Sequence, residues 1–136
     1  LLIARWQAGV GPRFVGVCTE DEGMGVNAGL YMGGQNPMMC IQNNGIFASI
    51  NTLKAIALDA RVPTFIMVGQ FQRDVNKTIE EQSSRAVRML EPTLDAWGVP
   101  HWRIEGPQDI GALKAAYDRA WKDQGPAVAI IGAPTL

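Results

Sequence analysis

Three consecutive acidic residues are the part of this sequence most suited to chemistry. Glu20, Asp21 and Glu22 follow a short β-like run, Arg13 to Cys18, and precede a helical pattern rich in glycine and alanine. In an open α/β sheet, ligands bind at the carboxyl ends of the strands, where these acids are expected to lie. The alternative is a solvated helix start, because acidic side chains favour the first helical turn. Taken alone, the three acids fit that alternative better.

A second polar stretch follows an apolar strand pattern. Met38 to Gln42 is a mostly apolar run, which is typical of a parallel strand buried on both faces. An almost entirely apolar helix is expected over Ile46 to Ala60, with Asn44 as its N-cap. A helix that is apolar nearly all round is covered on more than one side.

The residues between this strand and this helix are Gln42, Asn43, Asn44 and Gly45, which we call the amide lip. Polar groups at a strand end and a helix start either bind a ligand or cap the helix. Ligand binding is favoured for the first two residues of the amide lip, whereas both interpretations remain open for the last two. Asn51, further along the helix, is more typical of a buried amide with satisfied hydrogen bonds.

Together, the acidic stretch and the amide lip resemble the pyrimidine-binding domain of thiamine-diphosphate enzymes, in particular the α subunits of sulfopyruvate decarboxylase and phosphonopyruvate decarboxylase. That family carries Glu-Gly before an Ala/Gly-rich helix, then a strand ending in Gln-Asn-Ser-Gly and an Asn-containing helix. The resemblance spans nearly the whole chain. The matching residues here are Glu22-Gly23, Ala28-Gly29, Gln42-Asn43-Asn44-Gly45, Asn51, Arg61-Val62-Pro63, Gly98-Val99-Pro100 and Gly125-Pro126.

The resemblance implies that Glu22 is the acid beside the pyrimidine ring of thiamine diphosphate. Sharing of a proton there activates the aminopyrimidine, which forms the C2 ylid that attacks a 2-oxo acid and accepts electrons as CO₂ leaves. A carboxyl in an apolar cleft favours its protonated form, which suits proton sharing. The resemblance further implies that the amide lip contacts the pyrimidine or the substrate.

The family's diphosphate- and Mg²⁺-binding segment, Gly-Asp-Gly followed later by Asn, is absent. The resemblance therefore implies that a separate β subunit holds the diphosphate and the metal, in an α2β2 or larger assembly, and that this chain supplies no metal ligand. Charged residues make up 18% of the chain, below the usual share of about 25%. The low charge, and a helix face of Gly25, Gly29 and Gly33, indicate a surface covered by another chain or a flat ligand.

Other functions remain open. A carboligase or lyase would use the same cofactor, and a non-catalytic α/β interaction subunit would keep the fold but has no need of Glu22. An unrelated flavodoxin-like binding domain would need a phosphate-binding loop after its first strand, and Thr19 to Glu22 is unsuited to phosphate.

Composition limits the class of protein. The 136 residues support one domain, 1–136. A net charge of -1 gives no indication of nucleic acid or of an anionic membrane as partner, and no apolar run approaches the length of a membrane span. Cys18 and Cys40 both fall in strands predicted to be buried, so we expect reduced thiols in a cytoplasmic protein.

Strand and helix patterns alternate along the chain, which predicts an α/β fold with a mostly parallel sheet and helices on both faces. The end of a further helix is expected over Leu1 to Ala8, and Pro92 would kink or split the helix expected over Ile79 to Trp97. The expected strands are Arg13–Cys18, Met38–Gln42, Pro63–Val68, His101–Ile104 and Ala127–Ile131. The expected helices are Met24–Met32, Ile46–Ala60, Ile79–Trp97 and Ile110–Lys122.

The sequence departs from the family near its start. Family members have a further strand and helix before the strand that leads to the glutamate, whereas here Val10 runs directly into Gly11. Either this protein lacks that unit, or the sequence omits residues at the 10/11 junction. The second interpretation is favoured, because loss of a central strand would disrupt the sheet.

A second departure concerns the substrate. The family has Arg-Gly directly after the strand that matches Pro63 to Val68, and an arginine there suits a sulfonate or phosphonate. Here the sequence is Gly69-Gln70-Phe71-Gln72-Arg73. We therefore expect a 2-oxo acid with a less anionic, apolar or aromatic tail, with Gln70 and Arg73 as candidate substrate residues. Alternatively, Arg73 is a solvated loop residue paired with Asp74.

Overall fold

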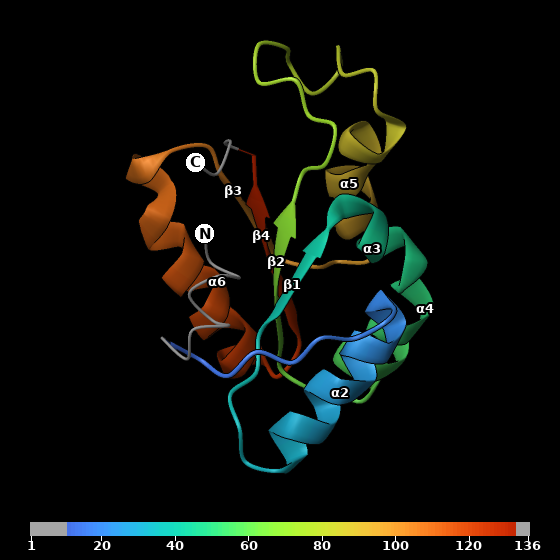
Figure 1. The fold of residues 1–136 in the computed structure, drawn as a ribbon, viewed down its shortest axis with the longest axis vertical. Coiled ribbons are helices and arrows are strands. Elements are labelled where there is room, and N and C mark those ends of the chain that lie inside the picture. The colour runs from blue at the N-terminus through green and yellow to red at the C-terminus, as the bar shows by residue number, and fades with distance from the viewer. Residues whose placement is uncertain (1–10, 133–136) are drawn as a thin grey trace.

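The structure of the protein is a computed structural model that describes residues 11–132. Within this range a single parallel sheet has the strand order β1-β2-β4-β3 (Figure 1). Its strands are β1 Met39–Gln42, β2 Thr64–Gly69, β3 His101–Ile104 and β4 Pro126–Ile131. The expected α/β class is confirmed, and the last four predicted strands are present.

Helices cover both faces of the sheet. Figure 1 shows α6 on one face and α2, α3, α4 and α5 on the opposite face. The π-helix η1 continues the path of α3 and α4, so the helix predicted over Ile46 to Ala60 is a succession of three short helical segments. The helices are α2 Glu20–Met32, α3 Asn43–Ala48, α4 Ile50–Thr52, η1 Leu53–Asp59, α5 Arg85–Ala96, the 3-10 turn η2 Pro107–Asp109, and α6 Ile110–Asp123.

Two apolar cores form because successive strand residues point to opposite faces. On β2, Phe65 packs in the core beneath α6, whereas Ile66 and Val68 pack in the larger core on the other face. On β4, Ala129 and Ile130 divide between the two cores in the same way. This alternation decides which side chains of β2 and β4 face α6 and which face the helices that carry the candidate site.

The first predicted strand is wrong. Residues 13–17 belong to none of the four strands found in residues 11–132, and the whole of Arg13 to Cys18 is exposed. A strand requires a neighbour for its backbone N–H and C=O groups. Within residues 11–132, β1 pairs only with β2, so its other edge is unpaired.

The expectation that both cysteines are buried is also wrong. Cys18 lies in the exposed segment before α2, and Cys40 lies on β1 facing away from the larger core, where α6 does not extend. Both are free thiols. The Cys40 thiol is nevertheless partly covered, and this burial raises its pKa.

The helix predicted from Ile79 begins only at Arg85. The side chain of Gln82, which is 1% exposed, donates to the carbonyl oxygens of Asp74, Lys77 and Thr78 and accepts from the Asp74 N–H. Arg88 donates to the Gln82 carbonyl. These bonds hold residues 74–84 as a structured loop. Pro92 lies inside α5 without splitting it.

Two expectations fall on the first ten residues. The helix end over Leu1 to Ala8 and the 10/11 junction lie outside the described residues. No helix among residues 11–132 is long and apolar enough to cross a membrane.

Candidate active site

The acidic cluster forms the first turn of α2. Thr19 is the N-cap, and its side-chain oxygen accepts from the Glu22 N–H at 3.5 Å. The Glu22 carboxylate turns back and accepts from the Cys18 N–H at 2.8 Å. This pair of bonds is close to a capping box, in which a side chain in the first turn satisfies a backbone donor that precedes the helix. Glu22 is exposed, and in this structure its carboxylate has a capping role.

Asp21 also belongs to the helix start. A hydrogen bond with the Thr19 side chain, and a second with the Glu22 N–H, hold the pKa of the Asp21 carboxyl below its usual range. Asp21 is therefore an ionised, solvated residue of the first turn, as the helix-start interpretation expected.

Glu20 differs from its two neighbours because it lies against the amide lip. A Cβ placed on Gly45 would lie 2.5 Å from Cγ and 2.9 Å from Oε1 of Glu20. In this position the Glu20 side chain lies directly over Gly45, which is buried, and a Cβ there would require Glu20 to move. Glu20 is half-buried, and within residues 11–132 its carboxylate has no hydrogen-bond partner.

Asn43 is the buried amide side chain of the amide lip, with no exposed surface. Its Nδ2 donates to the carbonyl oxygen of Phe71 at 3.3 Å, and its Oδ1 accepts from the Asn44 N–H at 3.1 Å. Asn43 therefore links the end of β1 to the loop that follows β2. This contact brings together two groups of predicted site residues that are far apart in sequence.

The other two amide side chains of the amide lip face solvent. Gln42 and Asn44 are exposed. The prediction that Asn44 caps the helix is wrong, because α3 begins at Asn43 with Gln42 in the cap position and no side-chain cap bond. Strand β1 passes into α3 without an intervening loop, which moves the helix start forward. Asn51 is exposed rather than buried.

The candidate substrate residues Gln70 and Arg73 form one tight turn. The Arg73 N–H donates to the Gln70 carbonyl at 3.2 Å, and Gln72 between them has a φ of 65°. A positive φ at a non-glycine residue is strained and is often found at functional sites. The turn is anchored to the sheet because the Gln70 N–H donates to the Ile131 carbonyl of β4 at 3.1 Å.

Arg73 points inward rather than to solvent. Its side chain is 10% exposed, and its Nη1 donates to Gln70 Oε1 at 2.8 Å and to Glu105 Oε1 at 2.7 Å. The predicted alternative, a solvated arginine paired with Asp74, is wrong. Asp74 instead accepts from the Asn76 N–H at 3.0 Å, which holds the pKa of its carboxyl below the usual range.

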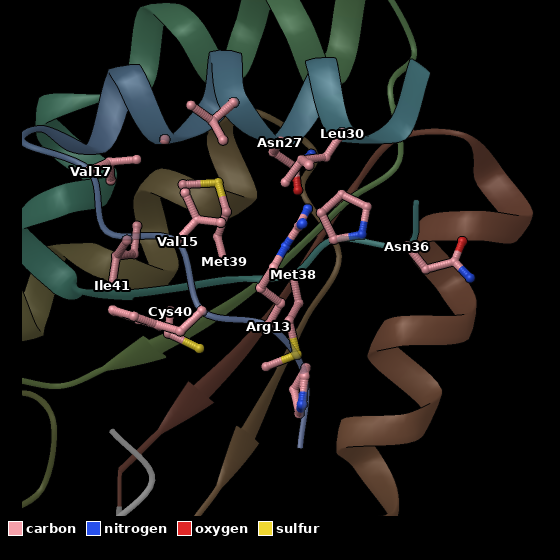
Figure 2. A pocket seen from close by; sticks show the side chains of 15 residues that line it. Arg13, Val15, Val17, Asn27, Leu30, Asn36, Met38, Met39, Cys40 and Ile41 are labelled. Carbon is pink, nitrogen blue, oxygen red and sulfur yellow. The ribbon is translucent and has the colours of Figure 1, made fainter. Parts of the chain in front are cut away.

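A separate pocket lies beside the unpaired edge of β1 (Figure 2). Its volume is about 220 Å³. Residues 12–17 form one wall, and Met39 and Cys40 of β1 lie on the other, with Asn27 and Leu30 of α2 above them. Neither Glu20, Glu22 nor the amide lip lines it.

Two members of the site were missed by sequence reasoning. Glu20 was interpreted only as a helix-start acid, although the glycine of the amide lip leaves space that an acid can fill. Glu105 was not singled out, because nothing in the sequence connects it with Arg73. One signal was present: Glu105 follows the end of a predicted parallel strand, and such ends meet at one edge of a sheet.

The fold and the site define an α/β protein with carboxylate, amide and guanidinium groups at the carboxyl edge of a parallel sheet. No family model matches the sequence. The chain is 28% identical over 94 residues to the sulfopyruvate decarboxylase subunit alpha of Methanocaldococcus jannaschii, covering 69% of this chain and 54% of that protein. It is 31% identical over 97 residues to the subunit of the same name from Methanococcus maripaludis, covering 71% of this chain and 57% of that protein.

A third relative is named sulfopyruvate decarboxylase and comes from Methanosarcina acetivorans. It is 27% identical over 112 residues, which cover 82% of this chain and 28% of that protein. The chain thus spans about half the length of the two alpha subunits that it matches, at 54% and 57%. The resemblance to sulfopyruvate decarboxylase that the motifs indicated is confirmed.

Proposed function

We propose that this chain is the pyrimidine-binding subunit of a thiamine-diphosphate-dependent 2-oxo acid decarboxylase. Two relatives are named as alpha subunits, which supports a separate β subunit that carries the diphosphate and Mg²⁺ sites. The observation that carries the proposal is the position of Glu20 against the amide lip at the carboxyl edge of the sheet, with a carboxylate that has no hydrogen-bond partner among residues 11–132.

The residues at this edge fit an aminopyrimidine. Glu20 offers a carboxyl oxygen for a ring nitrogen, and the exposed amides of Gln42 and Asn44 offer donors and acceptors. The absence of a side chain at Gly45 gives the acid access to the lip. When bound, thiamine diphosphate supplies a carbon nucleophile and an electron sink for the release of CO₂.

Two acids compete for the role of proton partner. The family motif assigns it to Glu22, but the Glu22 carboxylate accepts from the Cys18 N–H at 2.8 Å. The geometry favours Glu20, whose carboxyl group is half-buried and unpaired within residues 11–132. A carboxylate that is not already held by a backbone donor is available to a ring nitrogen of the cofactor.

The experiment combines the chain with its β subunit, thiamine diphosphate and Mg²⁺, and follows CO₂ release. Sulfopyruvate, phosphonopyruvate, pyruvate and phenylpyruvate are supplied in turn. We expect decarboxylation of at least one of them, with a preference for the uncharged tails. Release of CO₂ from none of the four, in a complex that binds the cofactor, would contradict the proposed activity.

A further inference from the structure

Gln70 and Arg73 each hold a buried donor that has no acceptor in the described part of the chain. Gln70 is 9% exposed, and the Arg73 side chain is 10% exposed. The Gln70 amide is oriented by its Oε1, which accepts from Arg73. This leaves Gln70 Nε2 and Arg73 Nε without partners among residues 11–132. Buried donors without acceptors are costly, and such groups are often completed by a ligand.

The two donors belong to one cluster at the carboxyl edge of the sheet. Nε2 shares its amide carbon with the bonded Oε1, and Nε shares its guanidinium carbon with the bonded Nη1, so both lie beside the same hydrogen bond. The turn that carries them is tied to the amide lip through the bond from Asn43 to the Phe71 carbonyl, at 3.3 Å. The cluster therefore adjoins the proposed cofactor site.

Glu105 neutralises this cluster. Its Oε1 lies 2.7 Å from Arg73 Nη1 and 3.6 Å from Arg103 Nε, and Arg103 also pairs with Glu91. The charges in this network thus balance, with arginines 73 and 103 against glutamates 91 and 105. An arginine with a bonded carboxylate is a poor receptor for a second anion, because like charges would then share one guanidinium.

We propose that Glu105 sets the charge preference of the site by occupying Arg73, so that a sulfonate or phosphonate tail is rejected and an uncharged tail is accepted. That the ligand is the tail of a 2-oxo acid rests on the proposed function. The charge state of the cluster rests on the geometry alone. If the carboxylate is removed, Arg73 and Gln70 present a guanidinium and an amide to an oxyanion.

The test uses methanesulfonate, which carries the sulfonate without the 2-oxo acid. Its binding is measured by calorimetry on the full-length protein in the assembly in which it is purified. Glu105→Gln keeps the size of the side chain and an acceptor for Arg73. We expect it to bind methanesulfonate roughly tenfold tighter than the wild type at low salt, with the gain falling as ionic strength rises.

Two controls make the result specific. The double variant R73Q/E105Q removes both charges and should lose the increase in affinity for methanesulfonate. Asp118→Asn makes the same charge change on α6, where Asp118 pairs only with Lys114 within the described residues, and should show no gain. Unchanged affinity in a folded Glu105→Gln, as judged by its thermal unfolding, or a gain that persists in the double variant, overturns the proposal.

A second measurement separates this inference from the proposed function. In the complete enzyme, Glu105→Gln should raise kcat/KM for sulfopyruvate relative to phenylpyruvate. If no variant releases CO₂ but the methanesulfonate results hold, the decarboxylase assignment fails and the role of Glu105 stands. If CO₂ is released and the ratio is unchanged, the role of Glu105 fails and the decarboxylase assignment stands.

Discussion

Two acids of the first turn of α2 have different surroundings, although only Asp21 separates them. Successive helical positions point in different directions, so Glu20 faces the amide lip and Glu22 faces the chain before the helix. Glu20 covers Gly45, whereas Glu22 accepts from the Cys18 N–H. The two side chains can therefore be tested separately.

We expect Glu20→Gln to slow hydrogen–deuterium exchange at C2 of bound thiamine diphosphate by orders of magnitude, because an amide cannot share a proton in the same way. Glu22→Gln should leave exchange nearly unchanged and reduce stability by about 1 kcal/mol or less, through loss of negative charge at a helix start. Exchange is measured by NMR and stability by urea unfolding. If Glu22→Gln slows exchange and Glu20→Gln does not, Glu22 is the proton partner of the aminopyrimidine. If exchange is as fast as in the wild type in both variants, neither acid has that role.

At the scale of elements, prediction succeeds where hydrophobic periodicity and flanking turns agree. Strands β2 and β4 are continuous apolar runs between turn residues, so they lie within a residue or so of their predicted bounds. The predicted start of α5 at Ile79 fails because Gln82 bonds the backbone of residues 74–78, and hydrophobic periodicity does not report on a side-chain-to-backbone bond of that kind. The site is predictable in its amide lip but not in Glu105, which is brought to Arg73 only by the order of the strands.

The structured loop before α5 depends on Gln82. Its side chain donates to three carbonyls and accepts from one N–H, and it is 1% exposed. We expect Gln82→Ala to cost about 2 to 3 kcal/mol, because it leaves buried polar groups without partners. The loop should also become sensitive to limited proteolysis. Gln35→Ala, at an exposed position, is the matched control. Equal proteolysis of the two variants would show that Gln82 does not hold the loop.

Within residues 11–132 one edge of β1 has no strand neighbour, which supports the interpretation that residues are missing at the 10/11 junction. The pocket of about 220 Å³ lies between that edge and the extended residues 13–17 (Figure 2). A further parallel strand there would pair with that edge of β1 and extend the sheet towards residues 13–17. A parallel connection needs at least about a dozen residues. We therefore expect an intact mass above the 14.8 kDa of the 136 residues, and a mass equal to it would refute the idea.

At the scale of the whole molecule, the proposed site depends on a partner. The chain contains no Gly-Asp-Gly segment, and two of its relatives are named as alpha subunits. We expect the purified chain alone to bind thiamine diphosphate weakly and to release no CO₂ from any 2-oxo acid. Addition of the β subunit should restore both. Turnover by the chain alone, verified as free of other proteins, would refute the two-subunit proposal.

The glycine face of α2 is where we expect the partner to lie. Gly25 and Gly29 are exposed, and a Cβ on either would meet no atom of the described chain within 4 Å. The chain itself therefore gives no packing reason for glycines that each cost a helix about 1 kcal/mol relative to alanine.

We expect Gly29→Ala to raise the unfolding free energy of the lone chain by up to about 1 kcal/mol. The same change should weaken assembly with the β subunit, because an added methyl group prevents close backbone approach. Gly111→Ala, an exposed helical glycine on α6 with equally open space, should stabilise the chain without affecting assembly. Sedimentation of the two variants with the β subunit separates these outcomes, and equal assembly would place the interface elsewhere.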